Sequence, residues 1–240
     1  MVALKGGNAY PINQLKYVNP QSYHETAGLE IGLNTVIFQS DTYRQAGATL
    51  SLFMFISRCS PPKLHNWLRR VKLRENADYT RPKEQRGPLV WIEDNMRYIT
   101  KLMKFCAQHQ QITVELAIPN FCIVRNEDEY EPLAFLWAGV FLKSAFRTTD
   151  VVEIVTYSGT SQRKMRKLYF DVIHKEHQRD VERLRGKSTN LRFCVDRKKY
   201  MVDLYLDKLV DHWSRTIGVP HPQLKDDWVK FAREWTQYGI

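Results

Sequence analysis

The hydrophobic and polar positions between residues 30 and 74 predict a strand followed by two helices. Residues 30–39 (EIGLNTVIFQ) are rich in β-branched and apolar side chains, as is typical of a strand. Ser40 and Asp41 can accept the free N–H groups of a first helical turn, so a helix is expected to begin there and to end near Ser57. After the break at Ser60-Pro61-Pro62, a second helix is predicted from apolar residues at i, i+3, i+4 and i+7: Leu64, Trp67, Leu68 and Val71.

The rest of the chain alternates helical patterns with shorter extended segments. Helices are predicted at about 88–109, 132–146 and 161–186, and as two further stretches after residue 200. Strands are predicted at 112–124, 150–156 and 191–195. The fold class expected is α+β and mostly helical, with a few short strands. The expected divisions are an irregular arm, the strand-helix-helix unit, a helical domain and a C-terminal helical segment, at 1–28, 29–75, 76–190 and 191–240.

A strand, a capped helix and a second helix follow one another in the ribbon-helix-helix DNA-binding unit. In that unit two chains pair their strands into an antiparallel ribbon, and one face of the ribbon reads base edges in the major groove. Here Thr35, Ile37 and Gln39 share one face of the predicted strand, and glutamine can contact adenine through two hydrogen bonds. The alternative is an ordinary core strand with two packing helices.

The charge of the chain is segregated along the sequence. The chain of 240 residues has 36 Lys and Arg against 26 Asp and Glu, a net charge of +10. Residues 61–104 carry a net +6 and residues 151–200 a net +7, while residues 105–150 between them carry −3. Two basic blocks on one face can follow two stretches of phosphate backbone, so the expected partner is nucleic acid. The candidate phosphate contacts are Arg44, Ser60, Lys63, Arg69, Arg70, Lys72, Arg74, Arg163, Lys164, Arg166 and Lys167.

The second block opens a predicted helix with four cations between Arg163 and Lys167. Cations at a helix N-terminus are disfavoured by the helix dipole, by a few tenths of a kcal/mol each, and a bound anion would reverse that cost. The alternative is a solvated basic face.

Other chemistries find little support in the sequence. The 4 cysteines form no CxxC pair, and His174 and His177 on a charged stretch are more simply solvated than metal-bound. We therefore expect no enzyme activity, no metal, no cofactor and no small-molecule substrate. The most apolar window, Leu133–Leu142, is shorter than the roughly 20 residues that span a bilayer, so a cytoplasmic protein without a membrane partner is expected.

Three stretches resemble the AcaB-like proteins of conjugative plasmids and integrative conjugative elements. They are Gly28–Ala46, with its strand running into a helix that contains Thr and Arg; Asn76–Tyr79 followed by Trp91-Ile92-Glu93; and Phe135–Val155, where an apolar helix ends at Arg147-Thr148-Thr149-Asp150. The resemblance implies a homodimeric ribbon-helix-helix regulator that binds double-stranded DNA at the nucleoid and activates transfer genes. Its expected base-reading residues are Asn34, Thr35, Ile37 and Gln39.

Two alternatives to a sequence-specific regulator stay open. A non-specific nucleoprotein or relaxosome accessory protein would share the basic blocks without a ribbon. An enzyme with a phosphorylated substrate would use a basic groove, although no catalytic signature is present in the sequence.

Overall fold

The computed structural model describes eight stretches of the chain: residues 2–4, 35–40, 47–58, 68–75, 88–118, 131–147, 171–195 and 222–240. Within them, the side chains of residues 2–4, 88, 131–137 and 222–229 are not described. All structural statements below concern these residues.

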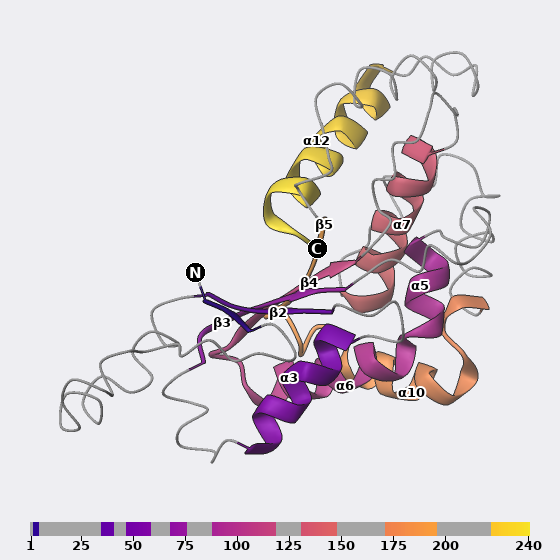
Figure 1. The fold of residues 1–240 in the computed structure, drawn as a ribbon. Coiled ribbons are helices and arrows are strands. Elements are labelled where there is room, and N and C mark those ends of the chain that lie inside the picture. Colours follow the sequence, from indigo (N-terminus) through magenta and orange to yellow (C-terminus); the bar gives the residue numbers. More distant parts are fainter. Residues whose placement is uncertain are drawn as a thin grey trace.

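Five strands form one parallel sheet, and they lie in the sheet in the order in which they occur in the chain (Figure 1). They are β1 (Val2–Leu4), β2 (Thr35–Gln39), β3 (Arg70–Arg74), β4 (Thr113–Ile118) and β5 (Leu191–Val195). Every neighbouring pair is parallel. Parallel neighbours need a crossover connection, so helices are expected between consecutive strands.

Six helices accompany the sheet in the described part of the chain. They are α3 (Gly47–Arg58), α5 (Pro88–Asp94), α6 (Met96–Gln108), α7 (Glu131–Phe146), α10 (Lys175–Leu184) and α12 (Pro222–Tyr238). Helices α3, α6 and α10 lie on one side of the sheet, and α12 lies on the other (Figure 1). The protein is therefore of a mixed α/β class.

One face of the sheet forms the hydrophobic core with α3 and α6. Strand residues alternate between faces, so the parallel register aligns apolar side chains in rows across four strands. One row contains Val36, Val71, Val114 and Leu191, and the next contains Phe38, Leu73, Leu116 and Phe193. All eight are buried. Each such burial stabilises the fold by about 1.5–3 kcal/mol, so these two rows fix the register.

The outer edge of β5 is closed by the residues that follow α12. Phe193 and Ile240 exchange two backbone hydrogen bonds, of 2.8 and 3.0 Å. The indole Nε1 of Trp235 donates to the carbonyl of Phe193 at 3.1 Å. Gly239 has a φ of +76°, and a Cβ there would lie 2.9 Å from the Sγ of Cys194, so glycine permits the close approach. These contacts satisfy backbone groups that an edge strand would otherwise expose.

The prediction of a second helix after Ser60 is wrong for residues 68–75, the part of this region that the structure describes. Arg70–Arg74 form strand β3, because RVKLR alternates with a period of two and buries Val71 and Leu73. Among the described residues, the predicted strand-helix-helix unit contains strand β2, helix α3 and strand β3, and residues 59–67 of the predicted second helix lie outside them. Strand β2 pairs with β1 on one side and with β3 on the other, so it has no free edge for the antiparallel ribbon of a ribbon-helix-helix dimer.

Other sequence predictions are confirmed or refined. Strands β4 and β5 and helix α7 lie within or close to their predicted ranges, and α12 is one of the two helical stretches predicted after residue 200. The helix predicted at 88–109 divides at Asn95 into α5 and α6. Val2–Leu4 form β1, although an irregular arm was predicted there, because these apolar residues pair with Val36–Phe38. A single parallel sheet was not predicted, and it replaces the scattered short strands of the expected α+β class.

Candidate nucleic-acid interface

The second face of the sheet carries the polar side chains of the strands, and we call it the polar face. It comprises Thr35, Ile37 and Gln39 of β2, Arg70, Lys72 and Arg74 of β3, Thr113, Glu115 and Ala117 of β4, and Arg192 and Cys194 of β5. The register aligns Ile37, Lys72, Glu115 and Arg192 in its central row. The polar face follows from the same alternation that builds the core.

Four cations and one carboxylate give the polar face a net positive charge. Arg70 and Arg192 are exposed, and Arg74 is half-buried. The side chains of Lys72 and Glu115 are 25% and 35% exposed, and Nζ of Lys72 lies 3.7 Å from Oε2 of Glu115. Strand spacing and rise place Arg70 and Arg74 about 13 Å apart along β3, with Arg192 about 10 Å across the sheet. The cations therefore form a patch rather than a point charge.

A polar face is unusual for an all-parallel sheet. Such sheets are commonly covered on both faces, and their strands are then apolar almost throughout. Here β3 and β5 alternate strictly, as RVKLR and LRFCV, and Gln39, Arg70 and Arg192 are exposed. Arg70 and Arg192 are thus open to an anionic partner, while Ile37 and Ala117 on the same face are buried.

The N-terminus of α3 is occupied by a carboxylate from the end of β3. Glu75 accepts hydrogen bonds from the backbone N–H groups of Ala48 (3.1 Å) and Thr49 (2.9 Å), and from the hydroxyl of Thr49 (2.7 Å). The predicted start of this helix at Ser40 and Asp41 is wrong, because α3 begins at Gly47 and Glu75 binds its free N–H groups. Burial raises the pKa of Glu75, although the hydrogen bonds from Thr49 and Ala48 oppose the rise. Helix N-termini commonly bind anions, and at α3 this site is already occupied by the carboxylate of Glu75.

The pKa of Glu75 gives a test of this contact. Because burial raises the pKa in the folded state, the contribution of Glu75 to stability is fully present below pH 4.5 and is lost as pH rises through the folded pKa. Glu75→Gln keeps the size of the side chain and one acceptor oxygen but loses the acceptor for one N–H group, at a cost of about 1–2 kcal/mol. We expect the stability advantage of the wild type to be larger at pH 4 than at pH 7 in denaturant unfolding. Glu182→Gln, an exposed matched change, should show no such trend; an advantage that grows with pH would contradict the contact.

One nitrogen at the same end of the sheet lacks a partner in the described structure. The Nε of Arg74 is buried and makes no hydrogen bond there. Arg74 is the register partner of Gln39, which is exposed. A buried donor without a partner costs free energy.

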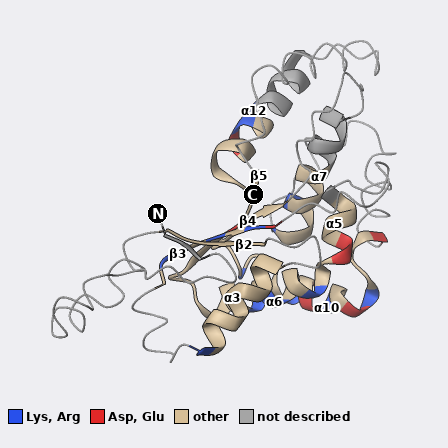
Figure 2. Ribbon diagram, viewed as in Figure 1, with Lys and Arg blue, Asp and Glu red and all other residues tan. Residues whose placement is uncertain are grey.

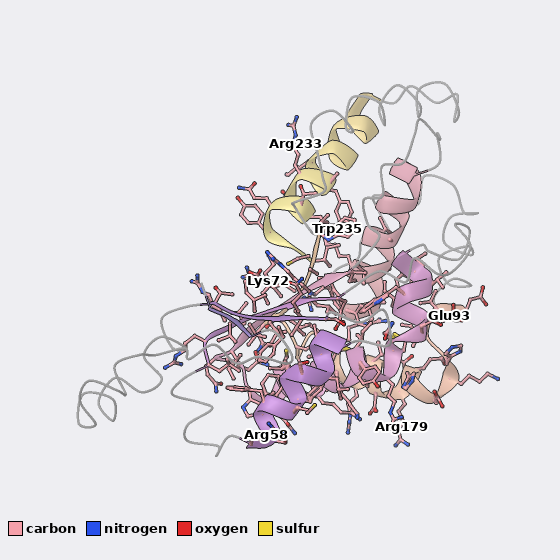
Figure 3. The ribbon with its side chains drawn as sticks, viewed as in Figure 1. Arg58, Lys72, Glu93, Arg179, Arg233 and Trp235 are labelled. Atoms are coloured by element: carbon pink, nitrogen blue, oxygen red, sulfur yellow. The ribbon has the colours of Figure 1, made fainter. Side chains whose placement is uncertain are left out.

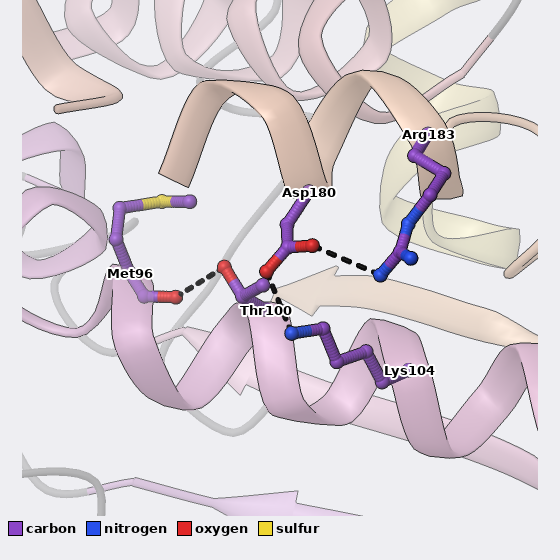
Figure 4. Close-up of polar contacts among 5 residues, drawn as sticks. All are labelled: Met96, Thr100, Lys104, Asp180 and Arg183. Atoms are coloured by element: carbon purple, nitrogen blue, oxygen red, sulfur yellow. Dashed lines mark hydrogen bonds and ion pairs between the residues drawn. The ribbon is translucent and has the colours of Figure 1, made fainter. Parts of the chain in front are cut away.

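The surface of α6 and α10 carries cations that are balanced by acids. Asp180 accepts a hydrogen bond from Nζ of Lys104 at 2.6 Å and one from Arg183 at 2.9 Å (Figure 4). The hydrogen bond from Lys104 lowers the pKa of Asp180. Helix α10 mixes Lys and Arg with Asp and Glu along its length (Figure 2). Compared with this surface, the polar face has the clearer excess of positive charge.

The structure brings some of the predicted site residues together. Thr35 and Gln39 of the predicted readers lie on the polar face beside Arg70 and Arg74. Arg69, which is exposed, directly precedes β3. Ile37 is wrong as a base reader, because it is buried in the sheet with 3% exposure. Eight predicted residues lie outside the described part of the chain: Asn34, Arg44, Ser60, Lys63, Arg163, Lys164, Arg166 and Lys167.

Sequence reasoning missed two residues of the polar face, Glu115 and Arg192. The alternation of Leu191–Val195 was the available signal for Arg192, because it places this residue opposite the apolar positions. No local pattern in the sequence identifies Glu115, because its place between Lys72 and Arg192 is set by the pairing of the strands.

The described residues offer little for a catalytic or metal centre. No group of three or more His, Cys, Asp and Glu that could hold a metal occurs among them. Burial raises the pKa of the Cys106 thiol to about 12, which removes the thiolate needed of a nucleophile. No helix within the described ranges has the length and apolar character to cross a membrane.

Comparisons with protein-family models, curated proteins and solved structures find no match to this chain. The class defined by the structure is a mixed α/β protein with one polar, cationic face on its parallel sheet.

Proposed function

We propose that the protein binds double-stranded DNA through the polar face of its sheet. The observation that carries the proposal is the aligned set of cations Arg70, Lys72, Arg74 and Arg192 on one face. Lysine and arginine side chains that neutralise phosphates supply much of the affinity of DNA-binding proteins. The patch extends about 13 Å along β3, which suits a polyanion better than a single phosphate group.

Sequence preference, in this proposal, comes from side chains beside the cations. Gln39 is exposed at the carboxyl end of β2, and Thr35 is half-exposed at the other end. Glutamine and threonine both form hydrogen bonds to base edges. A transcriptional activator of transfer genes on a mobile element is the role that the sequence resemblance favours. Base reading by a dimeric ribbon would need β2 to leave its two neighbours, so the proposal does not depend on a ribbon.

The salt dependence of DNA affinity tests the proposal. With four phosphate contacts, log Kd should change with log salt with a slope of magnitude about 3.6 on duplex DNA. Fluorescence polarisation of a labelled duplex between 50 and 300 mM salt (about the usual range for such binding) measures it. Absence of binding at the lowest salt, or a slope near zero, would refute phosphate contact by the polar face.

A non-specific nucleic-acid-binding protein is the second candidate. It is favoured because the polar face has more cations that can bind phosphates than side chains that can read bases. In the described strands this face has no aromatic side chain, and single-strand binders usually stack bases on aromatics. Duplex DNA is therefore the better ligand in either case, and competition between cognate and random duplexes distinguishes the two candidates.

A further inference from the structure

Glu115 is the carboxylate at the centre of the polar face. The register places Lys72 beside it on β3 and Arg192 beside it on β5, so a cation neighbours it on each side. Neighbouring strands lie about 4.8 Å apart, so both cations are within reach of the carboxylate. The contact with Lys72 is formed, at 3.7 Å between Nζ and Oε2.

The fold does not depend on Glu115 for packing. Its side chain is 35% exposed and that of Lys72 is 25% exposed, and an ion pair at this level of exposure contributes little to stability. Glutamate is also depleted in strands, so local propensity gives no reason for its presence in β4. Because neither packing nor strand propensity explains Glu115, we look for its role in ligand binding by the polar face.

We propose that Glu115 is an internal counter-ion of the polar face, which competes with DNA phosphates for Lys72 and Arg192. This inference rests on the proposed function. A phosphate that contacts Lys72 must displace the carboxylate, and the carboxylate then remains close by and repels it. The cost falls on every DNA sequence alike, because every sequence presents the same phosphates. An unfavourable contact of this kind lowers the affinity for every duplex, so that the added contacts of base-reading side chains are needed for tight binding, while the difference in free energy between sequences is unchanged.

A carboxylate on a DNA-binding face can also read cytosine, by accepting a hydrogen bond from its N4 amino group. The geometry favours the counter-ion role. Glu115 is half-buried and held at Lys72, whereas Arg70 and Arg192 on the neighbouring strands are exposed. A surface that approaches the sheet meets these arginines before it meets the carboxylate.

The substitution Glu115→Gln separates the two roles. Binding of the full chain is measured by fluorescence polarisation on two duplexes, one of random sequence and one selected from a library. Loss of the carboxylate should tighten binding to both duplexes alike, by about fivefold, as expected for one charge near 4 Å in water-like surroundings. The salt slope should stay near that of the wild type, because the number of phosphate contacts is unchanged and only the repulsion from the carboxylate is removed. Glu182→Gln on α10 makes the same change of charge away from the sheet and should alter binding less than twofold (about the effect of net charge alone).

Three results would overturn this role for Glu115. Unchanged or weaker binding to both duplexes would show that the carboxylate does not compete with phosphates. A change on one duplex only would identify Glu115 as a base reader. If neither the wild type nor Glu115→Gln binds any duplex, the proposed function itself fails, and the counter-ion role fails with it. Unaltered thermal unfolding of Glu115→Gln, followed by circular dichroism, shows that each result concerns the surface and not the fold.

Discussion

Arg147→Ala is expected to destabilise the protein by about 3 kcal/mol, the largest effect of any single substitution considered for this chain. Thermal or denaturant unfolding, followed by circular dichroism, measures it. For a chain of this size the midpoint of thermal unfolding should fall by roughly 6–12 °C.

The reason is the position of Arg147 directly after α7. Its guanidinium donates to four backbone carbonyls, those of Phe146, Ser188, Leu191 and Ile240. Burial lowers the pKa of Arg147, so the charged group is held in the interior at a cost. Alanine would leave buried carbonyl oxygens without a partner and would separate α7 from β5 and from the residues that close the edge of the sheet.

Arg147→Lys is the matched control for this prediction. Lysine keeps the charge but has one nitrogen with three donors, so it cannot reach four separate carbonyls. We expect an intermediate loss of stability. If both variants were as stable as the wild type, the contacts of Arg147 with the four carbonyls would not contribute to the stability of the fold.

Replacing Arg70, Lys72 and Arg192 together by alanine should weaken duplex DNA binding by roughly 10³-fold. Three charge-assisted contacts are lost, at about tenfold each. The magnitude of the salt slope should fall by about 3, because each lost phosphate contact removes about 1 from it. Random and selected duplexes should be affected alike, since phosphates carry no sequence information.

The matched control removes three cations from α10: Lys175, Arg179 and Arg183. All three are exposed, and they lie among the acids of that helix. In Figure 3, Lys72 lies at the sheet and Arg179 lies on α10, away from the sheet. The control lowers the net charge by the same amount, so an equal loss of affinity would mean that net charge, and not the polar face, drives binding.

Local patterns in the sequence were enough to find several elements. The apolar run of Glu131–Phe146 and the alternation of Leu191–Val195 each predict the element that the structure contains. Strand β3 was missed because Leu68 and Val71 also fit the spacing of a helix, and only pairing with β2 and β4 decides between the two periods.

The candidate site depends on contacts that are distant in sequence. Glu75 binds N–H groups 26 and 27 residues away, so no local capping rule could identify it. The cations of β3 were expected to contact phosphate, and the structure places them beside Thr35 and Gln39. Their alignment with Arg192 results from the register of the whole sheet, which the sequence alone does not reveal.

The carboxylate of Glu75 at the start of α3 also closes the N-terminus of this helix to an external anion. A small phosphorylated metabolite is commonly anchored by a helix N-terminus, and here that anchor is taken up from within the chain. The remaining cations are spread over the sheet, about 10 Å from β3 to β5. One phosphate group cannot reach across that distance, whereas a chain of phosphates can. If the polar face binds DNA as proposed, the fold selects for length in its ligand.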